Sequence, residues 1–291
     1  MIYLTLQYQS VLGNFFPNYE INCPPRLTRR YGIKAEASQS IKAISKVSKK
    51  RPTGNHRSTK KGGANIRNLY TRVKTAKGRK TSSTRWLNRQ LNDPYVEAAK
   101  RDGYRSRSAY KLLQLNERFR ILKPGMKVVD LGAAPGGWSQ VVSRGIGSDQ
   151  IGSSAKLIAV DVIEMDPLPG TKFFLQDFML DGASLAIKEA LEGGADAILS
   201  DIAPPLTGHR QTDHLRIIAA AEAAYIFSCE VLHRGGCFVG KVFQGGTEEA
   251  LLNELKKKFK SVKHAKPAAS RTESPEVYVV AQGYHGVDGN Q

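Results

Sequence analysis

Cysteine, long apolar runs and metal-binding patterns are all scarce in this chain of 291 residues. The three cysteines, Cys23, Cys229 and Cys237, form no C-x-x-C pair, which argues against a disulfide framework and favours a reduced compartment. The histidines show no metal-ligand spacing with them, so we expect no metal site. No apolar run reaches the ~20 residues that span a bilayer, and no secretory signal pattern opens the chain, so we expect no membrane association.

Acidic residues are nearly absent from the first quarter of the chain. Residues 1–80 hold 18 Lys and Arg but only two acidic residues, a net charge of +16, whereas residues 81–291 hold 26 basic and 24 acidic residues. Such a charge is typical of a segment that binds a polyanion, most often nucleic acid. We therefore expect a basic, unstructured extension at 1–80, able to bind RNA by counterion release, and a folded domain at 81–291.

A basic N-terminus with few acids is also typical of a mitochondrial transit peptide. Lysine outnumbers arginine in this segment, however, and its first residues show no basic amphipathic helix. We therefore expect a cytoplasmic protein, with a mitochondrial location as the alternative.

The chain is organised around residues 127–140, KVVDLGAAPGGWSQ in one-letter code. The apolar run predicts a buried strand, and the glycine-rich turn leads into a predicted helix from Trp138, which brings backbone N–H groups close to a ligand. The spacing G-x-x-x-G-G, with Asp130 before the first glycine, differs from the G-x-G-x-x-G of dinucleotide sites. It favours a carboxylate-bearing nucleoside such as S-adenosylmethionine, with its amino-acid end on the loop and Asp130 facing its ammonium group.

Strand and helix patterns alternate after this stretch, which predicts an α/β fold with a mostly parallel sheet and helices on both faces. Upstream, Asp93 and Pro94 predict the start of a helix that runs to Arg101, and Ser106 or Ser108 is expected to cap the next helix. The last two strand patterns resemble a hairpin, so one edge of the sheet is expected to be antiparallel. The predicted strands are 126–131, 156–161, 172–175, 195–201, 237–243, 262–266 and 276–281, and the later predicted helices are 182–192, 212–233 and 247–259.

Acidic residues stand at the ends of the predicted strands, which is where ligands bind in open α/β sheets. Asp161 is the candidate for the ribose hydroxyls of a nucleoside, and Asp177 for its exocyclic amine. An Asp at a strand end often only caps the next turn. Because Asp130 and Asp201 end two further strands near the glycine loop, the four together favour a nucleoside site.

Lys241 lies inside an apolar strand pattern, where a lysine is costly unless it is paired or deprotonated. Such a lysine is a candidate general base. The alternative is that it occupies the last exposed position of the strand.

Arg105, Arg107 and Lys111 cluster near the start of a predicted helix, with Tyr104 and Tyr110 between them. Basic groups interleaved with aromatic rings suit RNA phosphates and bases, so the three are candidates for RNA contact. The same pattern suits a solvated helix face equally well.

Five segments carry motifs that belong together: Arg105–Leu112 (RSRSAYKL), Val129–Gln140 (VDLGAAPGGWSQ), Ser200–Pro204 (SDIAP), Val239–Gly245 (VGKVFQG) and Ser270–Tyr278 (SRTESPEVY). They resemble the FtsJ/RrmJ (RlmE) family of ribose 2′-O-methyltransferases, which act on a uridine of large-subunit (23S) ribosomal RNA. The resemblance covers about residues 82–284 and excludes 1–80. It implies a Rossmann-like methyltransferase sheet, S-adenosylmethionine as cofactor, and large-subunit ribosomal RNA or the large ribosomal subunit as partner.

The resemblance also implies particular site residues. Lys241 would take the proton of the ribose hydroxyl or orient that hydroxyl, Asp201 would position Lys241, and Lys111 and Glu276 would complete a catalytic tetrad. Pro205 departs from the family pattern, which commonly has Asn at this position. The proline lacks the side-chain donor of Asn and has no backbone N–H. The implied cofactor contacts fall on Gly136, Trp138, Asp161, Asp177 and Asp201.

Other functions stay open at this point. The same tetrad occurs in ribose 2′-O-methyltransferases that act on transfer RNA or messenger RNA caps. The basic extension and Pro205 also suit a ribosome-assembly factor that binds RNA without catalysis. A dinucleotide-dependent dehydrogenase is disfavoured by the glycine spacing. We expect a monomer.

Overall fold

The computed structural model describes residues 71, 73, 78–205, 207–244 and 249–286. They lie in one compact unit, Ile66–Gln291. The extension expected at 1–80 falls almost entirely outside the described residues, so its lack of structure stays a prediction. No helix in the described ranges is long and apolar enough to cross a membrane.

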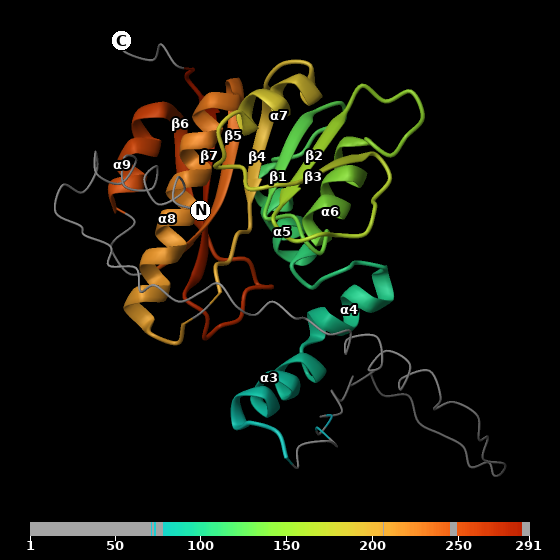
Figure 1. Cartoon of the computed structure of the whole chain (residues 1–291), viewed down its shortest axis with the longest axis vertical. Coiled ribbons are helices and arrows are strands. Elements are labelled where there is room, and N and C mark those ends of the chain that lie inside the picture. The colour runs from blue at the N-terminus through green and yellow to red at the C-terminus, as the bar shows by residue number, and fades with distance from the viewer. Residues whose placement is uncertain (1–70, 72, 74–77, 206, 245–248, 287–291) are drawn as a thin grey trace, which may run out of the picture. The chain divides into compact units, whose positions relative to one another are not determined.

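Seven strands form one sheet in the order β3-β2-β1-β4-β5-β7-β6 (Figure 1). The strands from β3 to β5 pair in parallel, whereas β7 runs antiparallel to both β5 and β6. The prediction of a mostly parallel sheet with an antiparallel edge is therefore confirmed. The strands are β1 (Lys127–Leu131), β2 (Lys156–Asp161), β3 (Thr171–Leu175), β4 (Ala195–Ser200), β5 (Leu232–Phe243), β6 (Phe259–Ala265) and β7 (Glu276–Tyr284).

The helices of the described residues follow from their end signals. Asp93 caps α4 by accepting the Tyr95 N–H, and Gly103 ends that helix in the left-handed conformation. The prediction of a serine cap on α5 is wrong, because the hydroxyls of Ser106 and Ser108 lie 2.6 Å apart and pair with each other. The helices are α3 (Thr81–Leu91), α4 (Pro94–Asp102), α5 (Ala109–Phe119), α6 (Gly137–Ile146), α7 (Ala183–Leu191), α8 (Arg210–Val231) and α9 (Glu249–Lys258).

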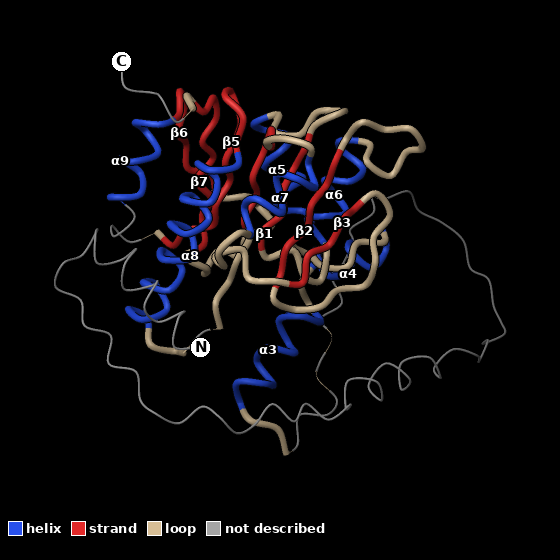
Figure 2. The backbone as a smooth tube through the Cα atoms, turned by 45° about the horizontal axis from the view of Figure 1, so that its top comes forward, coloured by secondary structure: helices blue, strands red, loops and turns tan. Residues whose placement is uncertain are grey.

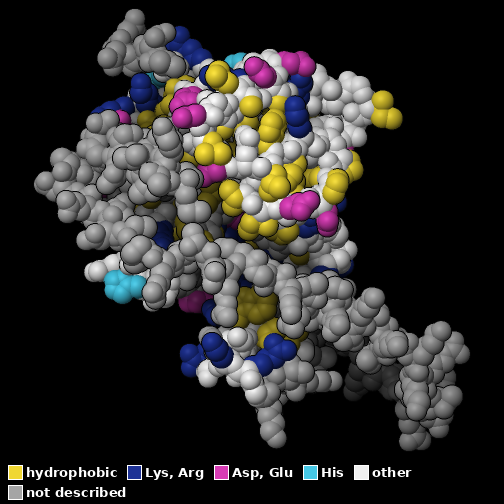
Figure 3. Space-filling view, viewed as in Figure 1, with side chains coloured by type: hydrophobic (Ala, Val, Ile, Leu, Met, Phe, Trp, Pro, Cys, Tyr) yellow, Lys and Arg dark blue, Asp and Glu magenta, His cyan; other side chains and the backbone are white. Residues whose placement is uncertain are grey.

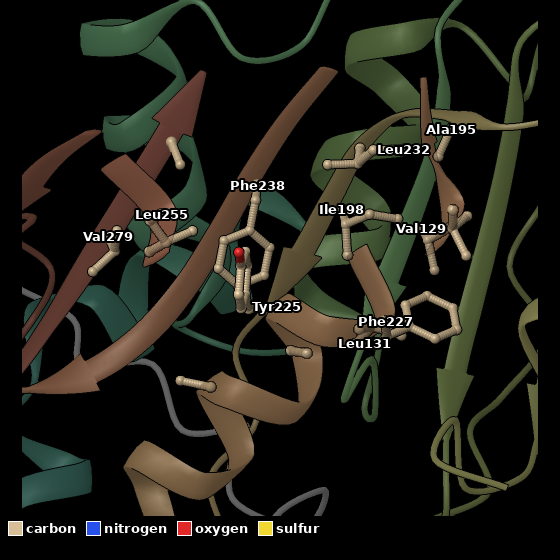
Figure 4. Close-up of a cluster of buried hydrophobic side chains, with 14 of the residues drawn as sticks. Val129, Leu131, Ala195, Ile198, Tyr225, Phe227, Leu232, Phe238, Leu255 and Val279 are labelled. Atoms are coloured by element: carbon tan, nitrogen blue, oxygen red, sulfur yellow. The ribbon is translucent and has the colours of Figure 1, made fainter. Parts of the chain in front are cut away.

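Helices cover both faces of the sheet (Figure 2), because alternate strand residues point to opposite sides and the middle strands β1, β2 and β4 carry buried apolar residues on both. Helices α7, α8 and α9 pack on one face, where the ring centroids of Tyr225 and Phe238 lie 6.3 Å apart (Figure 4). Helices α5 and α6 pack on the other face, against Val128, Leu199 and Val239. The sheet is thus buried on both sides, which leaves the strand ends as the place for a ligand.

Candidate active site

Four predicted site residues meet at the carboxyl ends of β4 and β5. Asp201 directly follows β4, Lys241 lies near the end of β5, and Glu276 opens β7. Because β4 and β5 are parallel and β7 is antiparallel to β5, these three positions come together at one end of the sheet. Lys111, in the first turn of α5, reaches them from the helix above. The sheet therefore assembles residues that lie far apart in the sequence.

Strand alternation decides which side chains point toward α5. Lys241 lies two residues after Val239 and opposite Tyr278 in the β5–β7 register, and both neighbours belong to the cluster under α5 and α6. Glu276 precedes Tyr278 by two residues and so shares this face. Lys241 is only 5% exposed, so the alternative that it occupies an exposed strand position is wrong.

Lys111, Asp201, Lys241 and Glu276 form a cluster in which positive and negative charges alternate, and we call this cluster the reactive group. Lys241 Nζ lies 2.6 Å from Asp201 Oδ1 and donates to the Asp201 backbone oxygen at 2.9 Å. Lys111 Nζ donates to Glu276 Oε2 at 3.1 Å and lies 3.8 Å from Asp201 Oδ1. Lys241 Nζ and Glu276 Oε1 are 4.0 Å apart, beyond hydrogen-bonding distance. Each buried ammonium group is therefore paired with a carboxylate, as a buried charge requires.

Asp201 is the centre of the reactive group, and Tyr278 is the partner that sequence analysis missed. The Tyr278 hydroxyl donates to Asp201 Oδ1 at 2.6 Å. Burial disfavours ionisation of Asp201, but Lys241 and Lys111 outweigh it, so the pKa of Asp201 lies below its usual range. Burial and the two nearby carboxylates hold the pKa of Tyr278 well above its usual range, so its hydroxyl stays protonated. Its position two residues after Glu276, on the same face of a strand, is the signal that would have found it.

Trp138 connects the reactive group to the glycine loop. Its ring centroid lies 5.6 Å from that of Tyr278, and its indole N–H donates to the Ser108 backbone oxygen at 2.9 Å. The side chain is 2% exposed and belongs to the core. Any cofactor contact at Trp138 must therefore come from its backbone, which lies in the first turn of α6.

The loop between β1 and α6 forms a cradle that only small residues permit. Gly132 and Gly136 have φ angles of +74° and +104°, and a Cβ on either would lie 2.7 Å from another side chain, that of Ile202 or Arg105. The N-cap residue of α6 is Gly136, which has no side chain to accept a hydrogen bond from the first turn. The first turn of this helix can therefore donate N–H groups to an anionic ligand.

Asp130 is fully buried behind this cradle. Its Oδ2 accepts from Ser139 Oγ at 2.6 Å, and its Oδ1 has no hydrogen-bond partner within the described part of the chain. Burial raises the pKa of Asp130 to about 7. An unpartnered carboxylate oxygen and an uncapped helix N-terminus together fit the ammonium and carboxylate ends of an amino acid.

Asp161 and Asp177 stand where the sequence predicts, at the end of β2 and just after β3. Asp161 accepts the N–H groups of Ala134 at 2.8 Å and Ile163 at 2.9 Å, and Asp177 accepts that of Met179 at 2.9 Å. Both residues therefore shape turns, as the plainer interpretation held, and Asp161 also ties the glycine loop to β2. Each carboxylate oxygen has two lone pairs, so both residues can still accept from a ligand.

The basic residues predicted to contact RNA all have protein partners. Arg105 donates to the Pro135 backbone oxygen at 3.3 Å, on the rim of the glycine loop. Arg107 Nε lies 3.1 Å from Asp93 Oδ2, and Lys111 belongs to the reactive group. These contacts give the three residues structural roles, and RNA contact stays a prediction for them.

The loop after Asp201 is held from helix α8. Asp213 Oδ1 accepts the Thr207 N–H at 2.6 Å, and Arg216 donates to the Pro205 backbone oxygen at 3.3 Å. Neither contact needs the N–H that Pro205 lacks. The departure at this position therefore leaves the loop anchored on both sides.

Comparison with known proteins decides the family. Residues 104–284 match the family model of FtsJ-like methyltransferases, a span that contains the glycine loop and the whole reactive group. The chain belongs to the FtsJ-like methyltransferase family.

Curated relatives match most of this FtsJ-like methyltransferase. It is 53% identical over 260 residues to the ribosomal RNA large subunit methyltransferase E of Rhodospirillum rubrum, covering 89% of this chain and 92% of the relative. It is 60% identical over 220 residues to the protein of the same name from Paramagnetospirillum magneticum, covering 76% and 90%. A crystal structure from Plasmodium falciparum, described provisionally as a ribosomal RNA methyltransferase, is 30% identical with a TM-score of 0.56, covering 63% of this chain and 100% of that one.

The FtsJ-like chain is thus a methyltransferase, and its methyl donor is S-adenosylmethionine. The cradle at Gly136, the glycine N-cap of α6 and the unpartnered oxygen of Asp130 fit the amino-acid end of that cofactor. Among the described residues, no cluster of His, Cys, Asp and Glu could hold a metal ion.

Proposed function

We propose that this chain transfers the methyl group of S-adenosylmethionine to the 2′-hydroxyl of a uridine ribose in large-subunit (23S) ribosomal RNA, alone or within the large ribosomal subunit. The ion pair between Lys241 and Asp201 carries the proposal. A ribose hydroxyl is a poor acid, so its attack on a sulfonium methyl gains from a base and from strict alignment. The names of the two bacterial relatives support the choice of RNA.

Lys241 orients the 2′-hydroxyl as an ammonium group or accepts its proton as a neutral amine. Its ammonium form has three donor hydrogens, and Asp201 engages two of them through Oδ1 and the backbone oxygen, which leaves one for the ribose oxygen. Only the neutral amine can accept the proton, so kcat is expected to rise with pH. Lys111 and Glu276 tune the charge of the group and contact the target nucleotide.

The cofactor supplies an electrophilic methyl group, and the chain holds it in place. Gly136 and Trp138 contact its amino-acid end through their backbone. Asp161 binds the ribose hydroxyls, Asp177 binds the exocyclic amine, and Asp201 contacts the cofactor from the reactive group. The placement of the five residues around the cradle and the neighbouring strand ends supports this division.

The remaining proposals concern organisation and setting. Residues 1–80 form a basic extension that binds ribosomal RNA, beside a methyltransferase domain at 81–291. The protein acts as a monomer in the cytoplasm, and Arg105 and Arg107 contact RNA at the mouth of the site. The relatives named above are bacterial, so they give no support to a mitochondrial location.

Methyl transfer from labelled S-adenosylmethionine to purified large ribosomal subunits that lack ribose methylation tests this function. Wild type is compared with Lys241→Ala, and the modified nucleotide is identified by mass after digestion. We expect 2′-O-methyluridine with the wild type alone. Full methyl transfer by Lys241→Ala with an unchanged pH profile would contradict the proposed role of Lys241 toward the ribose hydroxyl.

Other outcomes would redirect the substrate. Methylation of transfer RNA or capped RNA, with none on large subunits, would favour the related methyltransferases that act on those RNAs. Cofactor binding without transfer to any RNA would favour an assembly factor.

A further inference from the structure

Helix α3 presents a basic surface that the reactive group does not use. Its main neighbour is α4, and it lies at one end of the compact unit, away from the strands (Figure 1). Sequence analysis assigned this helix no role. We define the α3 surface as Lys80, Arg85, Trp86 and Arg89, all of which are exposed.

The charge of the chain continues into α3 and stops there. Residues 81–291 hold 26 basic and 24 acidic residues, and removing Arg85 and Arg89 leaves 24 of each in residues 93–291. The whole net charge of +18 therefore lies in residues 1–92. Figure 3 shows Lys and Arg side chains gathered over α3, next to hydrophobic side chains. This helix is thus the described, folded end of the basic segment.

The side chains of the α3 surface are free to bind. Arg85 and Arg89 make no hydrogen bond or ion pair with the described residues, unlike Arg105 and Arg107. They are one helical turn apart, roughly 5–6 Å between Cβ atoms, so both can contact the same stretch of an RNA backbone. Their charges are therefore available to phosphates.

Trp86 lies beside these arginines, with Arg89 three residues further along the helix. It is 51% exposed, and it is the one aromatic side chain classed as exposed in the part of the chain that the structure describes. Burying an indole in a core stabilises a fold, so an indole exposed between two free guanidinium groups calls for a partner outside this unit. A nucleobase has a flat face that stacks on such a ring, and its phosphates complement the charge.

We propose that the α3 surface binds the RNA substrate, with a base of an unpaired segment stacked on Trp86 and neighbouring phosphates on Arg85 and Arg89. This inference rests on the proposed function, because it takes ribosomal RNA as the substrate. It assigns α3 to affinity for RNA, and it leaves cofactor binding and the chemical step to the sites described above.

The test measures binding of unmethylated large-subunit RNA, transcribed in vitro, to the full chain over a range of salt concentrations. The variants are Arg85→Gln/Arg89→Gln, Trp86→Ala and Trp86→Phe. The matched control is Lys256→Gln/Lys260→Gln, which removes two exposed charges from α9 and β6. Thermal unfolding and the Kd for S-adenosylmethionine are measured for each variant, to show that the fold and the cradle are intact.

We expect Arg85→Gln/Arg89→Gln to raise the Kd for RNA and to make the salt dependence shallower by about 1.4 in log Kd against log salt, the loss of two single-strand phosphate contacts. Trp86→Ala should raise the Kd about tenfold with the salt dependence unchanged, and Trp86→Phe should retain most of the affinity. In methyl transfer, the KM for RNA should rise while kcat at saturating RNA stays constant.

Three results would overturn the inference: equal losses in the α3 and control variants, an unchanged Kd for Trp86→Ala, or a change of oligomeric state in that variant, which would assign Trp86 to a protein contact. Binding is measured without turnover. A chain that binds RNA through α3 but forms no 2′-O-methyluridine would contradict the proposed function alone.

Discussion

The reactive group and the cofactor cradle lie at the same end of the sheet, yet they are built differently. In the cradle, contacts of shorter range shape the strand ends: Asp161 accepts from Ile163, two residues away, and from Ala134, 27 residues away. In the reactive group, hydrogen bonds join residues 40 positions apart, at Lys241, and 165 positions apart, at Lys111. The cradle thus needs only the neighbouring strands β1 and β2, whereas the reactive group also needs β4, β5 and β7.

The two regions also differ in how many of their polar groups have hydrogen-bond or ion-pair partners. The reactive group pairs its own lysines with its own carboxylates, so it is preorganised without a ligand. In the cradle, Asp130 Oδ1 has no hydrogen-bond partner among the described residues, and the N-cap residue of α6 is a glycine. Changes in the cradle should therefore affect cofactor affinity, and changes in the reactive group should affect the chemical step.

The largest expected effect within this comparison is on the cradle. Asp161→Asn removes the charge that is to accept from the ribose hydroxyls, and hydrogen bonds to charged groups are worth ~1.5–3 kcal/mol. The Kd for S-adenosylmethionine should rise roughly 10- to 100-fold, measured by calorimetry, with kcat at saturating cofactor nearly unchanged. Glu164→Gln, an exposed carboxylate nearby, is the control. A fall in kcat with an unchanged Kd would break the division between the two regions.

Tyr278→Phe should have a smaller effect, of about tenfold, on kcat. The ring keeps its place against Trp138, but Asp201 Oδ1 loses the hydrogen bond that it accepts at 2.6 Å. The pH profile of kcat should shift with it, because Asp201 is paired with Lys241. The Kd for S-adenosylmethionine reports on the cradle and should stay constant. A variant with wild-type kcat and pH profile would reduce Tyr278 to a packing residue.

The smallest expected effect is a change in how stability depends on pH. Burial raises the pKa of Asp130 to about 7, so between about pH 4 and pH 7 the folded chain binds a proton that the unfolded chain has lost. The free energy of unfolding should therefore fall as pH rises through this window. Asp130→Asn should remove this pH dependence. The measurement is urea unfolding of wild type and variant at a series of pH values.

Saturating S-adenosylmethionine sharpens the same measurement. If its ammonium group faces Asp130, it favours the ionised carboxylate and lowers the pKa, so the fall in stability should flatten. An equal fall with and without the cofactor would place the ammonium group elsewhere.

Local patterns in the sequence predicted the sheet well. The strand predicted at 156–161 has the same bounds in the structure, as β2, and Asp161 stands at its end as expected. Asp201 and Lys241 could also be singled out locally, one as a strand-end acid and the other as a lysine in an apolar strand. Lys111 and Glu276 carried no such signal, because their importance lies in partners that only the folded sheet brings near, and the family resemblance supplied them.

Where prediction failed, a side chain had found a partner that the sequence pattern did not indicate. Ser108 occupies the N-cap of α5, but its hydroxyl pairs with Ser106, and its backbone oxygen accepts from Trp138. Arg107 forms an ion pair with Asp93 that its position in the sequence did not indicate, and its contact with RNA stays a prediction. Helix α3 was not predicted, because its apolar residues Trp86 and Leu91 are exposed and mark no buried stripe.

Strand β7 lies between β5 and β6, and it is the last strand of the described chain. During synthesis it therefore emerges after every strand of the cradle has been made. A chain still on the ribosome, or one cut short before residue 276, has the glycine loop but lacks Glu276 and Tyr278. Completion of the reactive group thus marks completion of the sheet, and a fragment that ends before residue 276 keeps its cofactor loop but lacks two side chains of the proposed catalytic site.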